Sequence, residues 1–155
     1  MSKYIIIDLD NCISNDAHRI PLINWREPDQ FKRYDRYHRM STADVCHNRD
    51  LFEVREEKIL VFTSRPVAHR EITERWLERV GVPVHALLMR NDADFRSSVE
   101  VKRTQLSWLE AYDVTLPEIV CAYDDREAII TMYREHGLPA ELRKIHDVSA
   151  YREKE

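Results

Sequence analysis

Glycine is scarce in this chain: among 155 residues only Gly81 and Gly137 occur. Phosphate-binding loops of the P-loop type and dinucleotide-binding turns need several closely spaced glycines, because the backbone must approach the phosphates without an intervening Cβ. With two distant glycines, the chain can build neither loop. The sequence therefore excludes both of these common routes to nucleotide binding.

Cysteines are also few, and Cys12, Cys46 and Cys121 form no CxxC pair. This pattern fits a reducing cytoplasm and argues against a disulfide scaffold. His47 follows Cys46, but the second pair of ligands that a zinc site needs is missing. No apolar run approaches the roughly 20 residues of a membrane span, and the first strand begins too early to leave room for a signal peptide. We therefore expect a cytoplasmic protein without membrane attachment.

The formal net charge of −4 does not favour nucleic-acid binding, but the charge is distributed unevenly. Between His18 and Arg49 there are seven Lys or Arg residues and four acidic residues, a net charge of +3, which leaves −7 for the remainder. The basic residues are mostly arginines, which suit bidentate contacts with phosphate. A solvated surface of mixed charge explains the segment equally well.

Apolar runs and helical spacing alternate along most of the chain. Strands are expected at residues 4–9, 58–63, 84–89 and 119–123, with a short edge strand at 143–145. Helices are expected from Ser64-Arg65-Pro66 to Gly81, over about 99–112 and over 126–136. The alternation after residue 58 is typical of a doubly wound parallel sheet with right-handed crossovers, a Rossmann-like α/β fold in a single domain over 1–155.

Residues 13–57 do not follow this alternation. The segment contains a group of aromatic side chains: Trp25, Phe31, Tyr34, Tyr37 and His38. Three of them, Phe31, Tyr34 and His38, fall on one side of a possible short helix. We interpret the segment as a small cap inserted over the active site, with a simple helical connection as the alternative. Its aromatic side chains could stack on a nucleobase or pack onto the sheet.

Two pairs of acidic residues close apolar strands. Asp8 and Asp10 close the first strand, and Asp124 and Asp125 follow the run from Ile119 to Tyr123. Open α/β folds build their sites at the carboxyl edge of the sheet, and four carboxylates there would repel one another without a cation. Because Mg²⁺ prefers clustered oxygen ligands, we expect a magnesium site at this edge. The alternative role for one of the later pair is to cap the following helix.

Two further groups lie between the acidic pairs: Thr63-Ser64-Arg65 at the end of the second strand, and Lys102 on a helix. A carboxylate beside a bound phosphate can form an aspartyl-phosphate, and a second acid two residues later can serve as general acid and base. A hydroxyl such as Thr63 can bind a phosphoryl oxygen, and Lys102 can neutralise developing charge. Each residue also has a purely structural explanation. Thr63 favours strand formation, Lys102 could pair with a neighbour on the surface of its helix, and Arg65 could form a surface salt bridge.

In this order, the motifs resemble those of the haloacid dehalogenase superfamily of phosphotransferases: Asp-x-Asp, then Thr or Ser, then Lys, then an acidic pair. The match covers the whole chain. More narrowly, several stretches look like the 3′-phosphatase domain of phage-type polynucleotide kinase and its stand-alone phage and bacterial relatives. They are Val61-Phe62-Thr63-Ser64-Arg65, Trp76-Leu77 with Gly81-Val82-Pro83, Leu88-Met89-Arg90, Val101-Lys102, Tyr123-Asp124-Asp125-Arg126 and Met132-Tyr133-Arg134.

The resemblance implies a role for each matched position. Asp8 is the expected nucleophile, Asp10 the general acid and base, and Lys102 the group that stabilises charge. Phosphate or substrate would be bound by the second motif and one arginine after the third strand: Thr63, Ser64, Arg65 and Arg90. Mg²⁺ would be held by the acidic residues: Asp8, Asp10 through its backbone carbonyl, Asp124 and Asp125.

The chain departs from the usual family pattern in two places. Asn11-Cys12 replaces Gly-Thr after the first motif, and Ser64 replaces a glycine after the hydroxyl residue of the second. Asparagine tolerates left-handed backbone angles better than most residues, so we expect the turn at Asn11 to survive. The second departure leaves open whether Thr63 or Ser64 contacts phosphate.

We therefore expect a Mg²⁺-dependent phosphomonoesterase that acts on a nucleotide-type substrate. Overall acidity and small size favour a nucleoside monophosphate, and the alternative is a 3′-phosphorylated nucleic-acid end. A small-metabolite phosphatase of the same fold and a non-catalytic receiver-like module are further alternatives. Receivers place their acid pair at the first strand, and the late pair Asp124-Asp125 argues against this class. The residues leave open whether the protein is a monomer or a dimer.

Overall fold

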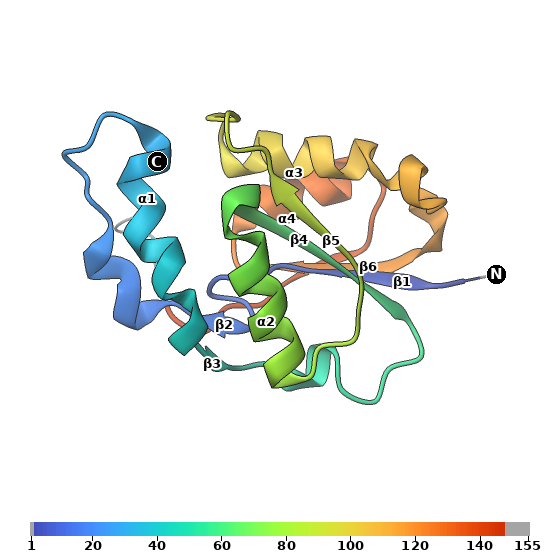
Figure 1. Cartoon of the computed structure of the whole chain (residues 1–155). Helices are drawn as coiled ribbons and strands as arrows, with labels where there is room; N and C mark the ends of the chain where they lie inside the picture. Colours follow the sequence, from blue (N-terminus) through green and yellow to red (C-terminus); the bar gives the residue numbers. More distant parts are fainter. Residues whose placement is uncertain (1, 148–155) are drawn as a thin grey trace.

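The computed structural model describes residues 2–147. Within this range, five parallel strands form the central sheet in the order β5-β4-β1-β6-β7 (Figure 1). The strands are β1 (Tyr4–Ile7), β4 (Lys58–Pro66), β5 (Val84–Arg90), β6 (Ile119–Asp124) and β7 (Ala140–Leu142). The helices on the sheet are α2 (Arg70–Val80), α3 (Ser98–Ser107) and α4 (Glu127–Glu135). The predicted Rossmann-like α/β fold is confirmed.

The alternation of side chains along β1 supplies two core layers. Ile5 and Ile7 pack in one layer with Trp76 of α2. Ile6 packs in the other with Leu106 of α3 and with α4. Both faces of the sheet are covered, which explains why its strands read as continuous apolar runs. Full burial of each isoleucine contributes roughly 1.5–3 kcal/mol to stability. This packing fixes the position of β1, and therefore of Asp8, which follows it.

The start of α2 differs from the prediction. A helix was expected at Ser64-Arg65-Pro66, but β4 continues through these residues and Pro66 pairs with Arg90 of β5. Proline disfavours helical backbone in the residue before it, so Arg65 stays extended. A 3-10 turn, η4 (Val67–His69), then leads into α2 at Arg70.

Three other boundaries also differ. β1 ends at Ile7 rather than at residue 9, because the chain turns after Leu9. The carbonyl of Leu9 accepts from the backbone N–H groups of Cys12, Ile13 and Ser14. The edge strand β7 covers 140–142 rather than 143–145, since Ala122 already donates to the carbonyl of Pro139 at 2.9 Å. The expected helix over 99–112 is α3 followed by a separate 3-10 turn, η5 (Leu109–Tyr112), which Asp113 ends in the left-handed conformation.

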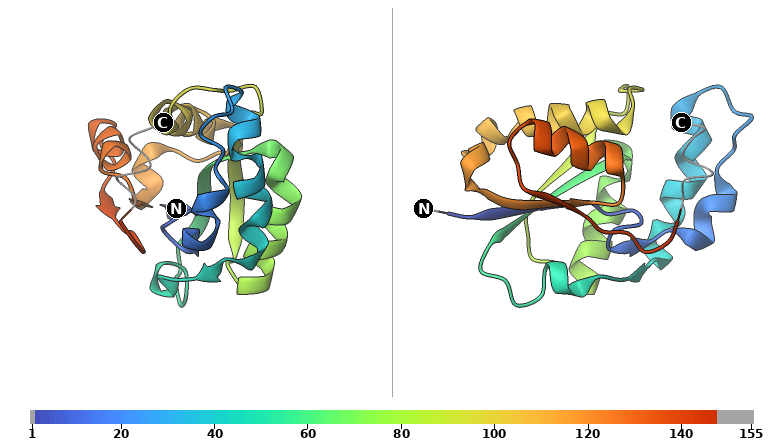
Figure 2. Two further views of the ribbon diagram at one scale, coloured as in Figure 1. Left: turned by 90° about the vertical axis from the view of Figure 1, so that its left-hand side faces the viewer. Right: turned by 180° about the vertical axis from the view of Figure 1, so that it is seen from behind.

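The elements of the segment between β1 and β4 are the antiparallel pair β2 (Ser14–Asn15) and β3 (Val45–Cys46), the helix α1 (Gln30–Arg39), and the 3-10 turns η1 (Ala17–Leu22), η2 (Met40–Ala43) and η3 (Arg49–Leu51). The part of the segment that contains η1 and α1 lies beyond the carboxyl ends of the strands, and the part after β3 runs back along the sheet to the start of β4 (Figures 1 and 2). α1 is the expected short helix. Asp29 caps it by accepting from the backbone N–H of Lys32 at 3.1 Å.

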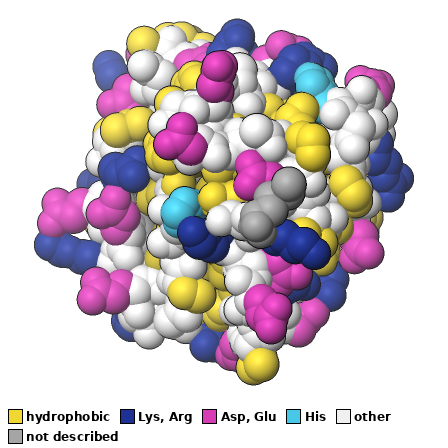
Figure 3. All heavy atoms as spheres, turned by 90° about the vertical axis from the view of Figure 1, so that its right-hand side faces the viewer, with side chains coloured by type: hydrophobic (Ala, Val, Ile, Leu, Met, Phe, Trp, Pro, Cys, Tyr) yellow, Lys and Arg dark blue, Asp and Glu magenta, His cyan; other side chains and the backbone are white. Residues whose placement is uncertain are grey.

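The opposite end of the molecule, where the strands begin, has a mixed surface. Figure 3 shows acidic and basic side chains interspersed there with apolar ones. Such mixing is usual for a solvated face. In the described part of the chain, no helix combines the length and the apolar character needed to cross a membrane.

Candidate active site

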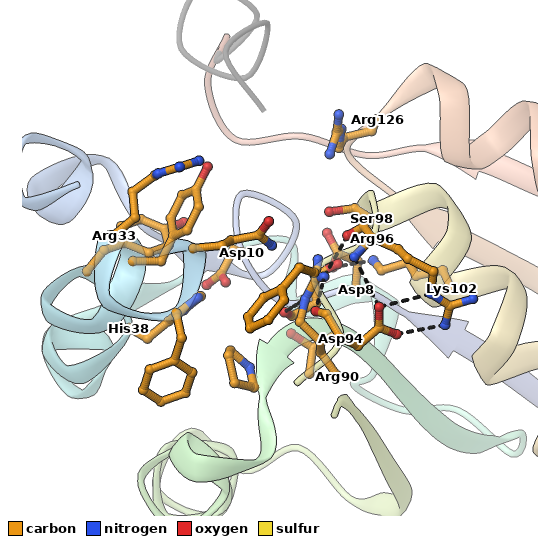
Figure 4. A pocket seen from close by; sticks show the side chains of 18 of the residues that line it. Asp8, Asp10, Arg33, His38, Arg90, Asp94, Arg96, Ser98, Lys102 and Arg126 are labelled. Atoms are coloured by element: carbon orange, nitrogen blue, oxygen red, sulfur yellow. Dashed lines mark hydrogen bonds and ion pairs between the residues drawn. The ribbon is translucent and has the colours of Figure 1, made fainter. Parts of the chain in front are cut away.

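The carboxyl edge of the sheet brings the predicted residues together. Asp8 follows β1, Thr63 lies in β4, Asp124 ends β6, and Lys102 extends from α3. All four line one cavity of about 110 Å³. Figure 4 shows Asp8 and Lys102 on the α3 side of this cavity, and Asp10 and His38 on the α1 side. The cavity thus lies between the sheet edge and the segment that follows β1.

Lys102 joins two of the carboxylates. Its ammonium group donates to Asp8 Oδ1 at 2.6 Å and also to Asp124 Oδ2, and the side chain is only 2% exposed. One turn later on the same face of α3, Gln105 donates to the carbonyls of Thr63 at 2.8 Å and of Leu88 at 3.3 Å. Because these bonds fix α3 against β4 and β5, they also fix the position of Lys102.

Burial and charge set the protonation of this group. Burial, together with the charge of Asp124, raises the pKa of Asp8 to about 6, although Lys102 opposes the shift. Burial alone would lower the pKa of Lys102, but the charges of Asp124 and Asp8 raise it above its ordinary value. Lys102 is therefore a permanent cation here. With a pKa of about 6, the Asp8 carboxyl is ionised at neutral pH and takes up a proton in mildly acidic solution.

Three carboxylates are arranged to hold a metal ion. Asp8, Asp124 and Asp125 are all buried, and one oxygen from each lies within 4.8 Å of the others. Three carboxylates against the one ammonium of Lys102 leave a formal charge of −2, which a divalent cation would balance. Hard oxygen ligands in this number suit Mg²⁺. Asp124 also accepts from the backbone N–H of Arg126 at 3.1 Å, which closes a turn ahead of α4, whose N-cap residue Arg126 receives no side-chain capping bond.

Asn11 orients the third carboxylate. Its side-chain amide donates to Asp125 Oδ2 at 3.0 Å and to the carbonyl of His146 at 2.8 Å. Its Oδ1 accepts from the backbone N–H groups of Ile145 at 3.2 Å and of His146 at 2.9 Å. The backbone is left-handed, with φ 61°, as its place in the first motif predicts. The asparagine that replaces the usual glycine therefore links Asp125 to the segment after β7.

We expect Asn11→Gly to lower Mg²⁺ affinity roughly 10- to 100-fold, the usual effect of losing a group that orients a metal ligand. Glycine keeps the left-handed turn, so the variant removes the amide and little else. Isothermal titration of Mg²⁺ would measure the change. The matched control is Asn48→Gly: Asn48 is also left-handed, with φ 51°, but its amide donates to the carbonyl of Cys12 at 2.7 Å. Equal losses in both variants would contradict the assignment.

Asp10 lies on the opposite wall, between two arginines. Arg65 binds it in a bidentate manner, with Nη2 at 2.6 Å from Oδ1 and Nε at 3.1 Å from Oδ2. Arg19 donates to the same Oδ1. Burial would raise the pKa of Asp10, but the charges of Arg19 and Arg65 outweigh it and hold the pKa well below the ordinary value. The side chain is thus held ionised and engaged by the two arginines rather than by the cluster of Asp8, Asp124 and Asp125.

The other predicted residues occupy different positions around the cavity. Thr63 and Ser64 both line it; Thr63 is buried, and its hydroxyl accepts from the backbone N–H of Arg65 at 3.2 Å. Because the hydroxyl oxygen of Thr63 accepts this bond, its proton is directed elsewhere. Arg90 lines the cavity but donates to backbone carbonyls, those of Ser64 at 2.8 Å, Asp94 at 2.9 Å and Arg96 at 2.7 Å. These contacts make Arg90 a support for the loop between β5 and α3.

The sequence did not single out Arg19, and it singled out His38 only as part of the aromatic group within residues 13–57. Arg19 is fully buried and binds both Asp10 and Asp44, the latter through Nε at 2.9 Å. His38 lines the cavity, and burial with the charge of Arg19 holds its pKa well below the ordinary value. A positively charged segment was noted in the sequence, but no local pattern distinguishes Arg19 from the other arginines in it.

Solved structures with the same fold include phosphatases and an RNA repair assembly. A chain of the Pnkp1/Rnl/Hen1 RNA repair complex is 24% identical with a TM-score of 0.68, and the match covers 96% of this chain and 44% of that one. A putative phosphatase from Clostridium difficile is 16% identical with a TM-score of 0.63, covering 90% and 83%. A putative β-phosphoglucomutase from Thermotoga maritima is 14% identical with a TM-score of 0.59, covering 98% and 91%. These likenesses establish the fold, and the present chain spans less than half of the repair-complex chain.

Membership of a family rests on the sequence itself. A comparison with curated proteins found no match. The family described as the polynucleotide kinase PNKP phosphatase domain, however, matches residues 2–141. This range contains both acidic pairs, the second motif and Lys102, so the resemblance stated from the motifs is confirmed. The chain belongs to the polynucleotide kinase phosphatase-domain family and is a phosphatase of the haloacid dehalogenase type.

Proposed function

We propose that this enzyme is a Mg²⁺-dependent phosphomonoesterase that removes the phosphate from the 3′ end of a nucleic acid. The observation that carries the proposal is the buried group of Asp8, Lys102 and Asp124 at the base of an open cavity. In a chain of this family, that arrangement supports the roles of nucleophile for Asp8, stabilising cation for Lys102 and metal ligand for Asp124.

Asp8 carries the covalent step in this proposal. Lys102 holds Asp8 through Oδ1, and we assign the attack on phosphorus to the second carboxylate oxygen. A new bond forms between this oxygen and phosphorus while the bond to the leaving 3′ oxygen breaks. Lys102 and the hydroxyl of Thr63 stabilise the charge that develops on the phosphoryl oxygens. Water then attacks phosphorus and releases inorganic phosphate, which regenerates the Asp8 carboxylate.

Asp10 acts as the general acid and base in this proposal. Its ionised form, which Arg19 and Arg65 favour, is suited to accept a proton from the attacking water in the second step. Asp10 then releases that proton to solvent, because Arg19 and Arg65 favour its ionised form. For the first step of the next cycle it takes a proton from solvent once the negatively charged substrate lies beside it, and it delivers this proton to the leaving oxygen.

The residues present fit a bound Mg²⁺. Asp8, Asp124 and Asp125 supply three buried carboxylates with a net negative charge around them, and Asn11 orients Asp125. When bound, Mg²⁺ would neutralise charge on the phosphate and hold it in line with Asp8. We assign the backbone carbonyl of Asp10 as a further ligand, as the resemblance to the haloacid dehalogenase superfamily implies.

The preference for a polynucleotide rests on the family and on the surroundings of the cavity. Arg33 from α1, Arg96 from the loop before α3, and Arg126 before α4 all line it, and they are labelled in Figure 4. Arginines on three elements suit a chain that presents several phosphates. We further propose that residues 13–57 form the cap of this site, since α1 supplies the wall that faces the sheet edge.

A nucleoside monophosphate is the second candidate substrate. The formal net charge of −4 disfavours a long polyanion, and this property favoured the mononucleotide from the sequence alone. Salt separates the two candidates. Binding of a polynucleotide weakens steeply with ionic strength, while a mononucleotide is far less affected.

The test is phosphate release with Mg²⁺ from a matched panel of substrates. The panel contains an oligonucleotide with a 3′ phosphate, the same oligonucleotide with a 5′ phosphate, and nucleoside 3′- and 5′-monophosphates. We expect release from the 3′-phosphorylated oligonucleotide, with kcat/KM falling as salt rises. Release from mononucleotides alone would replace the proposal by the second candidate, and no release from any member would contradict both.

A further inference from the structure

The cavity continues beyond the catalytic carboxylates to an aromatic wall on α1. Phe31, Tyr34, Tyr37 and His38 all line it. These rings also pack on one another: the ring centroids of Tyr37 and His38 are 5.0 Å apart, and those of Tyr34 and Tyr37 are 6.2 Å apart. The wall is therefore organised before any ligand binds, which lowers the entropy cost of binding.

Phe31 is at the start of this wall and is supported from behind. Its ring stacks on the ring of His69, with centroids 5.9 Å apart and an angle of 14° between the planes. His69 is itself buried at the start of α2 and lies 5.2 Å from the ring of His38. One face of Phe31 is thus occupied by protein, and Phe31 also lines the cavity.

Phe95 lines the same cavity from a different element. It lies in the loop between β5 and α3, which Figure 1 shows at the start of α3, on the same carboxyl side of the sheet as α1. Phe95 is 55% exposed, so its ring has apolar surface available for contact with a ligand in the cavity. The main chain on both sides of it is fixed, because Arg90 donates to the carbonyls of Asp94 and Arg96 at 2.9 and 2.7 Å.

We propose that Phe31 and Phe95 form a subsite that binds the base of the terminal nucleotide by stacking. The inference rests on the proposed function, since the base belongs to the nucleotide whose phosphate meets Asp8. The catalytic residues and both phenylalanines line one continuous cavity, so a base linked to the reacting phosphate through its sugar has these rings within its reach. Every base has a π face, so the subsite accepts all four with little preference.

The steady-state test compares two oligonucleotides with a 3′ phosphate, one with a normal terminal base and one with an abasic terminal sugar. Wild-type enzyme is expected to prefer the base-bearing substrate about 10-fold in kcat/KM, the scale of one stacked base. Phe95→Ala brings this ratio close to one, and Phe95→Trp restores it. The matched control is Trp108→Ala, because Trp108 is also exposed but lies outside this cavity; its ratio stays that of the wild type. A wild-type ratio near one, or an unchanged ratio in Phe95→Ala, overturns the subsite.

A binding measurement separates failure of the subsite from failure of the proposed function. In the Asp8→Asn background, an oligonucleotide with 2-aminopurine as its terminal base is titrated with protein. Stacking quenches the fluorescence on binding, and a second change, Phe95→Ala, abolishes the quenching. If the wild-type enzyme releases phosphate from no substrate while the Asp8→Asn protein still quenches the fluorescence, the catalytic proposal is overturned and the subsite is supported. Binding without quenching, detected by anisotropy of a distant label, overturns the subsite whatever the activity.

Discussion

Replacing Asp8 by asparagine is expected to lower kcat for phosphate release by roughly 10⁴-fold or more, the scale seen when a covalent nucleophile is removed. An amide cannot form the phosphoryl bond that the proposal places on Asp8. The measurement is phosphate release from a 3′-phosphorylated oligonucleotide with Mg²⁺. Residual activity within 10-fold of the wild type would show that another group attacks phosphorus.

The same variant is expected to remain folded and, without Mg²⁺, to be at least as stable as the wild type. Burial and Asp124 raise the pKa of Asp8 from 3.8 to about 6, so the folded state binds this proton more tightly than the unfolded chain. The stability that Asp8 contributes is therefore present below its unfolded pKa and is lost as pH rises through about 6. The Asp8→Asn variant would not show this loss, which is on the order of 3 kcal/mol. Urea unfolding against pH, in a chelator, would measure it, and a large destabilisation at neutral pH would contradict the electrostatic account.

Replacing Lys102 by methionine is expected to have the largest effect on stability. The change removes the cation that lies between Asp8 and Asp124 and leaves both carboxylates buried and facing each other. Removing one partner of a buried charge group typically costs about 3–5 kcal/mol. Activity would also fall, because the positive charge beside the phosphoryl group is lost.

Mg²⁺ should partly rescue the stability of Lys102→Met, since a cation bound by the same carboxylates relieves their repulsion. Thermal unfolding with Mg²⁺ and with a chelator would show this as a larger Mg²⁺-dependent shift than in the wild type. Lys58→Met is the control: Lys58 is exposed at the start of β4, so its replacement should change stability by less than about 0.5 kcal/mol. A Lys102→Met variant as stable as the control would contradict the assigned role.

The parts of the site that lie at strand ends could be predicted from the sequence. Asp8 and Asp124 follow apolar strands, and parallel topology brings the carboxyl ends of such strands to one edge. Lys102 followed from its place in the motif order, and its ammonium group contacts both of these carboxylates. These inferences need only local patterns and the order of strands.

The contacts that depend on how residues 13–57 fold could not be predicted. Arg19 of η1 binds both Asp10 and Asp44, and Asp44 follows η2, 25 positions later in the chain. The contact between Asn11 and His146 spans 135 positions of the chain. Arg90, expected to bind substrate, lines the cavity, and its guanidinium also donates to three backbone carbonyls that no local pattern predicts. Such long-range partners leave no periodic signal in a single sequence.

The most direct test of the account is a single-turnover reaction with a 3′-phosphorylated oligonucleotide, stopped in acid and analysed by mass spectrometry. The account predicts a transient protein species that carries one additional phosphoryl group, and peptide mapping places this group on Asp8. The species should be absent from Asp8→Asn and should decay as inorganic phosphate appears. Phosphate release at full rate without any phosphorylated protein, or a phosphoryl group on another residue, would contradict the central claim.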